Sequence, residues 1–240
     1  MGKFLLKEVE DKPLPFLEHL EELRRRLIYS IVVITIFSII SHRFVPLILK
    51  NLVKSTGKLV FISPTEAFLV NIKLTLFLGI YLSLPFLFYQ IWVFLGKGLK
   101  KDEKKIILPL SFISFILFNT GGFLCYFFII PMGIKLLFSY SLGIIEPMIS
   151  VNSYLSFILG MIFSFGLIFE LPLIMLFLTK IGLVSPLILR KYRRVVIVAI
   201  FIVSAILTPP DIFTQIALAL PLIVLYELSI IVSKILTKLK

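Results

Sequence analysis

Long apolar runs, separated by short polar and basic segments, dominate this chain. About 20 residues at about 1.5 Å each are needed to cross about 30 Å of hydrocarbon as a helix. Membrane-spanning helices are predicted at residues 27–41, 68–95, 106–133, 151–179, 195–208 and 213–232. These runs are too long and too uniformly apolar for the alternating strands of a β-barrel. The pattern predicts an all-α polytopic membrane protein, a concave bundle forming one integral membrane domain over residues 1–240.

The segment before the first run has a different pattern. Leucines recur there at helical spacing, which predicts an amphipathic helix at residues 16–26 that leads into the first span. Glu21 stands four residues before Arg25, and Glu22 four residues before Arg26, so each pair can form an ion pair worth about 0.3–0.5 kcal/mol. The same acids have a second interpretation, as a cytoplasmic site for a cationic partner.

Composition and charge support a membrane protein over a soluble one. The chain is 59% hydrophobic and 16% charged, whereas soluble domains are about half apolar and a quarter charged. Its mean hydropathy is +1.09. The net charge of +12 does not indicate nucleic acid, because the basic residues lie between apolar runs. Most of them flank the spans on one side, which places both termini in the cytoplasm by the positive-inside rule.

Two features inside the apolar runs are unusual. Glu170 lies ten residues before Lys180, roughly 15 Å into the membrane, where an ionisable group is expensive and becomes a candidate functional residue. The competing interpretation is a protonated carboxyl that only packs against a neighbouring helix. The fifth span has 14 residues, or roughly 21 Å, so this helix pair would thin the bilayer. Thr208 and Gln215 flank the turn after it and are candidate contacts for a partner helix. The competing interpretation is that they only cap the hairpin.

Catalytic motifs and metal sites are not found in the sequence. His19 and His42 fall on opposite sides of the predicted membrane, and Cys125 has no neighbouring base, so neither a metal nor another cofactor is expected. Two other function classes stay open from the residues alone. A proton- or ion-coupled secondary transporter of small solutes would use Glu170, and a membrane-embedded enzyme would need several titratable groups at one depth.

Several segments, in order along the chain, resemble the TatC family, the multispanning receptor subunit of the twin-arginine protein translocase. They are HLEELRRR at 19–26, YQIWVF at 89–94, the loop 99–105 with Glu103, SYLSF at 153–157, FGLIFELP at 165–172 and LTPPD at 207–211. Each motif alone is weak, but together they cover nearly the whole chain in the expected order.

The resemblance implies a function that the residue patterns could not supply. It implies a non-enzymatic receptor in the bacterial cytoplasmic (inner) membrane that binds the twin-arginine signal peptides of folded precursors, with transport driven by the proton-motive force. Glu22, Glu103, Arg24 and Phe94 would bind the signal peptide. The expected partners are single-span TatA/TatB-type subunits along the fifth span, further copies of the chain and membrane lipid, and no nucleic acid.

Overall fold

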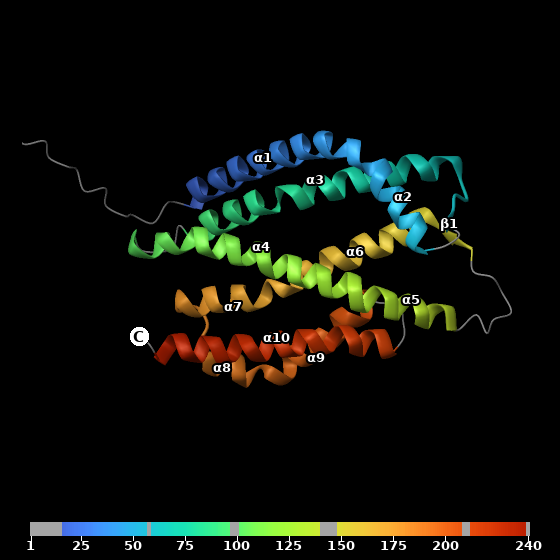
Figure 1. Cartoon of the computed structure of the whole chain (residues 1–240). Coiled ribbons are helices and arrows are strands. Elements are labelled where there is room, and N and C mark those ends of the chain that lie inside the picture. The colour runs from blue at the N-terminus through green and yellow to red at the C-terminus, as the bar shows by residue number, and fades with distance from the viewer. Residues whose placement is uncertain (1–15, 57–58, 97–100, 140–147, 208–211, 239–240) are drawn as a thin grey trace, which may run out of the picture.

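Two long helices lie side by side at one edge of the protein. The structure is a computed structural model, and it describes residues 16–56, 59–96, 101–139, 148–207 and 212–238. Helix α1 (Phe16–Ser41) packs along α3 (Pro64–Leu95), as Figure 1 shows. The two backbones meet at Gly79, where a Cβ atom would lie 1.9 Å from the Ser38 Oγ. Glycine therefore sets how closely α1 and α3 approach.

The segment that joins these two helices contains structure that the sequence pattern did not predict. The predicted connection between His42 and Ala67 holds a short 3-10 turn, η1 (His42–Phe44), and helix α2 (Val45–Thr56). Proline at position 46 lies in the first turn of α2, where a missing N–H disrupts no hydrogen bond. Strand β1 (Leu59–Val60) then pairs in parallel with β2 (Ile149–Ser150).

The third predicted span is divided into three parts. After a 3-10 turn, η3 (Lys101–Ile106), come α4 (Ile107–Leu124), the π-helical turn η4 (Cys125–Ile129) and α5 (Ile130–Ser139). The π turn inserts an extra residue into the helical ladder without ending the run.

The fourth predicted span is bent. Helix α6 (Val151–Phe169) ends at Glu170, and α7 (Leu171–Lys180) begins directly after it with Pro172 in its first turn. Proline cannot donate to the preceding turn, which explains why the helix breaks here. The polar Glu170 therefore lies at a break between two helices.

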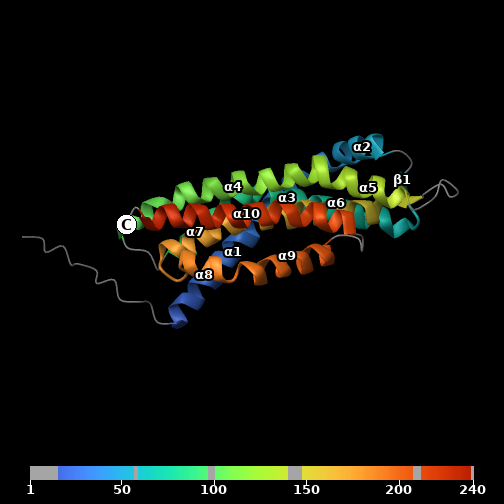
Figure 2. The ribbon, with the colours of Figure 1, turned by 90° about the horizontal axis from the view of Figure 1, so that it is seen from below.

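The last part of the chain packs on α7. It comprises α8 (Pro186–Lys191), α9 (Arg193–Leu207) and α10 (Ile212–Lys238). Figure 2 looks onto α10, with α8 and α9 along one side of it. The main cluster of buried apolar side chains joins α10 to α6 and to the π turn, with Leu218 and Phe165 fully enclosed.

Much of the outer surface is apolar. Ile39 is 71% exposed and Ile206 is 76% exposed, as suits side chains that face lipid. Within the described residues, four helical segments are long and apolar enough to cross a membrane: Glu18–Asn51, Pro64–Leu95, Lys104–Lys135 and Val151–Lys180. The chain is thus an all-α, multi-pass membrane protein.

Candidate functional site

The start of α1 is held against the end of α3 by two rings. The imidazole of His19 stacks on the phenyl ring of Phe94, with centroids 4.3 Å apart and planes inclined by 20°. These residues belong to two separate motifs of the sequence, and the structure brings them together. Phe94 thus acts from α3 to position the acidic turn of α1.

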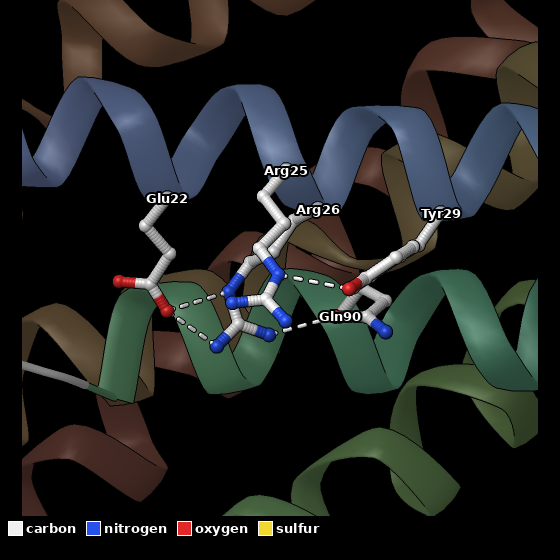
Figure 3. A network of polar contacts seen from close by, with 5 residues as sticks. All are labelled: Glu22, Arg25, Arg26, Tyr29 and Gln90. Atoms are coloured by element: carbon white, nitrogen blue, oxygen red, sulfur yellow. Dashed lines mark hydrogen bonds and ion pairs between the residues drawn. The ribbon is translucent and has the colours of Figure 1, made fainter.

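One turn further along α1, Glu22 binds Arg26. The Arg26 Nε and Nη2 both donate to the Glu22 Oε1, at 2.9 and 2.5 Å, and Nη1 donates to the Gln90 Oε1 of α3 at 2.7 Å. Figure 3 shows this network, with four of its five residues on α1. The side chains of Arg26 and Glu22 are only 19% and 13% exposed. The predicted pairing of Glu22 with Arg26 is therefore present, and it is partly shielded from solvent.

The other predicted pair, Glu21 with Arg25, differs. The Arg25 Nε donates to the Tyr29 hydroxyl at 2.8 Å, and the guanidinium lies 5.5 Å from the centre of the Tyr29 ring. Arg25 is thus directed along α1 toward its C-terminal end, whereas Glu21 and Arg24 are exposed.

A cavity of about 550 Å³ opens between this part of α1 and the end of α3. Its charged lining residues are Glu18, Glu21, Glu22, Arg25 and Arg26. Tyr29, Tyr89, Gln90 and Val93 complete the lining. A carboxylate suits a guanidinium because the planar fork of donors matches its oxygens. The cavity is therefore lined by three carboxylates and two guanidinium groups, and one of the carboxylates, that of Glu22, is already paired with Arg26.

Glu103 belongs to η3, the turn that leads from α3 into α4. Its side chain lies outside the described residues, so the structure gives no distance between Glu103 and Glu22. Arg24 and Phe94 are on α1 and α3, the two helices that border the cavity.

Glu170 lies inside the protein, 5% exposed, at the break between α6 and α7. The Trp92 Nε1 of α3 donates to the Ser114 Oγ of α4 at 2.7 Å, and the Ser114 hydroxyl lies beside the Glu170 carboxyl. The Glu170 Oε1 finds no hydrogen-bond partner within the described part of the chain. Glu170 therefore joins three helices through polar contacts.

A second polar cluster, at the other end of α3, was missed by sequence reasoning. Glu66 accepts hydrogen bonds from the backbone nitrogens of Ile62 and Asn152, at 2.7 and 2.8 Å, and from the Ser150 hydroxyl. The Lys73 Nζ donates to the Asn152 Oδ1 at 2.6 Å. Glu66 and Ser150 each stand just before a predicted apolar span. This position was the only feature of the sequence that could have indicated their contact. The cluster ties the β1–α3 segment to α6.

The last two helices are joined by a side chain that was predicted to contact a partner. The Gln215 Nε2 of α10 donates to the Phe201 carbonyl of α9 at 3.0 Å. Thr208 lies outside the described residues. Further along, Arg193 and Glu227 form an ion pair at 2.5 Å, with side chains that are 45% and 33% exposed. Gln215 thus already serves the hairpin of α9 and α10.

Within the described residues, no three His, Cys, Asp or Glu side chains are placed so that they could hold one metal ion. The ring of His42 contacts the Thr75 hydroxyl at 3.0 Å, and Cys125 is buried among apolar side chains.

Comparisons with known proteins agree on one family. Residues 18–221 match the family described as Sec-independent protein translocase protein (TatC). The TatC protein of Carboxydothermus hydrogenoformans is 39% identical over 231 residues, covering 94% of this chain and 95% of that protein. The TatC protein of Helicobacter pylori is 40% identical over 217 residues, covering 90% and 86%. A crystal structure of the twin-arginine translocase receptor TatC superposes with a TM-score of 0.80 at 36% identity, covering 91% of this chain and 99% of that one.

Proposed function

The chain belongs to the TatC family, the receptor subunit of the twin-arginine translocase, and from this we infer that the cavity between α1 and α3 receives the signal peptide. The protein is a transport protein and not an enzyme. Its ligand would be the paired arginines at the start of a folded precursor's signal peptide.

The observation that carries this proposal is the guanidinium already bound to Glu22. It supports a site suited to arginine, because the carboxylate accepts two N–H donors from one planar group. Glu18 and Glu21 line the same cavity and would attract a second cation. Partial shielding of Glu22 strengthens such bonds relative to open water.

Three further residues have proposed roles at this site. Glu103, in the turn that follows α3, would accept the second arginine. Phe94 would hold the acidic turn through its stacking on His19, and Arg24 would lie at the exposed rim.

The membrane arrangement proposed here has six spans, with α9 and α10 as the last two and both termini in the cytoplasm. The basic residues Lys104, Lys180 and Arg193 at helix ends support this orientation in a bacterial cytoplasmic membrane. The short α9 would thin the bilayer beside the bundle. Folded precursors would cross there, driven by the proton-motive force.

The partner site proposed for TatA/TatB-type single-span subunits lies along α9, near Thr208 and Gln215. Because Gln215 binds the Phe201 carbonyl, a partner helix would meet its remaining amide oxygen or compete for this bond. Self-association in a larger complex is proposed on the same grounds of family membership.

Photo-crosslinking tests the signal-peptide site. A photoreactive residue at Val93, which lines the cavity, should capture a twin-arginine precursor and lose it when both arginines are changed to lysine. The same residue at Ile39, at the far end of α1, is the matched control and should capture neither. Glu22→Ala should reduce the Val93 product. Equal capture of the twin-lysine precursor at Val93 would contradict the proposal.

A further inference from the structure

We propose that Arg26 is a built-in competitor for Glu22, which the signal peptide must displace in order to bind. The proposal rests on the function proposed above and adds a regulatory element to the same site. Arg26 occupies the carboxylate with the very group that the ligand carries. The free receptor would therefore be partly blocked by its own side chain.

The geometry shows how firmly Arg26 is held. Two of its donors share the Glu22 Oε1, and a third reaches Gln90 on the neighbouring helix. An exposed pair at this spacing on a helix contributes little, but here both side chains are mostly covered and the guanidinium is fixed from two helices. An incoming cation must replace these bonds to reach Glu22.

Displacement by an arginine is nearly balanced. The ligand's guanidinium can rebuild both bonds to Glu22, while an ammonium group presents a compact charge without the planar fork. The released Arg26 keeps an acceptor in Gln90 and has Glu18 and Glu21 in the same cavity. Because the competitor is removed whichever ligand binds, it lowers every cationic ligand's affinity by the same factor. The affinity of a weaker ligand, such as a lysine pair, is then too low for the receptor to retain it.

Arg25 provides a matched control one residue away. It carries the same charge on the same turn of α1, but it binds the Tyr29 hydroxyl and not Glu22. Arg25→Gln therefore removes one positive charge from the site and leaves the competitor in place. Any gain that Arg26→Gln shows beyond Arg25→Gln measures displacement and not general electrostatics.

The test uses the purified full chain in lipid nanodiscs and fluorescent twin-arginine and twin-lysine signal peptides. Arg26→Gln is expected to raise the affinity for both peptides by about tenfold, the order of one lost charge-assisted hydrogen bond, and to leave their ratio unchanged. Arg25→Gln should raise both by less than about threefold, as a solvated charge does. Arg26→Lys, which keeps the charge, should fall between the wild type and Arg26→Gln.

Combining substitutions separates this inference from the proposed function. In a Glu22→Gln background, which weakens the competing bond, Arg26→Gln should give no more gain than Arg25→Gln. If Glu22→Gln leaves peptide affinity unchanged in the Arg26→Gln background, where no competitor is present, the proposed binding site is wrong. If Glu22→Gln weakens binding while Arg26→Gln gains no more than Arg25→Gln, or weakens binding, Arg26 only positions Glu22 and the competitor is refuted. Melting temperatures of all variants show which of them remain folded.

Discussion

The indole of Trp92 donates to the hydroxyl of Ser114 at 2.7 Å, and the carboxyl of Glu170 lies beside that hydroxyl. Trp92 comes from α3, Ser114 from α4 and Glu170 from the break between α6 and α7. Three segments that are distant in sequence therefore meet at one hydroxyl, in surroundings that are otherwise apolar.

Removing the central hydroxyl should destabilise the protein. Ser114→Ala leaves the buried indole N–H of Trp92 without its acceptor, at a cost of about 1–3 kcal/mol. The control is Ser111→Ala, on the same helix, because the Ser111 Oγ only donates to the Ile107 carbonyl at 2.8 Å. Reversible unfolding in detergent micelles measures both. A loss of stability for Ser114→Ala no larger than that for Ser111→Ala would contradict a stabilising role for the bond between Trp92 and Ser114.

Substitution of Glu170 should separate binding from transport. Glu170→Ala is expected to leave signal-peptide binding largely intact, because the cavity between α1 and α3 is formed by other residues. Export of a precursor into membrane vesicles should fall, since a polar group at mid-membrane would assist polar cargo or respond to partners.

The amide variant shows which property of Glu170 matters. Glu170→Gln can keep a hydrogen bond to Ser114 but cannot ionise. Export at the wild-type rate in Glu170→Gln would assign the residue a hydrogen-bonding role alone. Export at the wild-type rate in Glu170→Ala would reduce Glu170 to a packed polar group.

Hydrophobic patterning predicted the apolar helices because a membrane leaves few other solutions for a backbone. It also predicted the pair of Glu22 and Arg26, since helical spacing alone brings them together. The break at Glu170 had a local cause in Pro172, yet only the tertiary structure shows that Trp92 and Ser114 meet there.

Other features depend on partners distant in sequence or on weak local signals. Glu66 and Ser150 are 84 residues apart, and the spacing of apolar residues along the chain does not predict their contact. Helix α2 has 12 residues, too few to cross a membrane, and it falls between the first two predicted spans. The π turn at Cys125–Ile129 accommodates one extra residue in the helix. It lies in a uniformly apolar run, so the sequence pattern does not indicate its position.

A methyl group at Gly79 should push α1 away from α3. The added Cβ would lie 2.8 Å from the Ser38 Cα, a backbone atom that cannot rotate away, so Gly79→Ala should cost about 1–3 kcal/mol. Gly160→Ala is the matched control, because nothing lies within 4 Å of its added Cβ. Thermal unfolding should rank Gly79→Ala well below Gly160→Ala. Equal stability would mean that the helices can shift apart at little cost.

Loss of the Gln215 amide should loosen the last two helices. Gln215→Ala removes the donor to the Phe201 carbonyl and should lower the free energy of unfolding by about 1 kcal/mol. Cysteines introduced at positions of α9 and α10 that do not face each other should then form disulfide bonds more often than they do in the wild type. Ile216→Ala, next to it and exposed, serves as the control. If a single-span partner still crosslinks to α9 in Gln215→Ala as before, Gln215 belongs only to the hairpin.

The contact between Glu66 and Ser150 also sets an order of events during synthesis. When the ribosome has added Glu66, it must add another 84 residues before Ser150, whose hydroxyl binds Glu66, is part of the chain. Until β2 and the start of α6 have been made, β1 has no strand to pair with and Glu66 has no hydrogen bond from the Asn152 nitrogen. The start of α3 therefore lacks these contacts in the nascent chain. A chain that ends before Ser150 should be cleaved by protease more readily at the start of α3 than the full chain is.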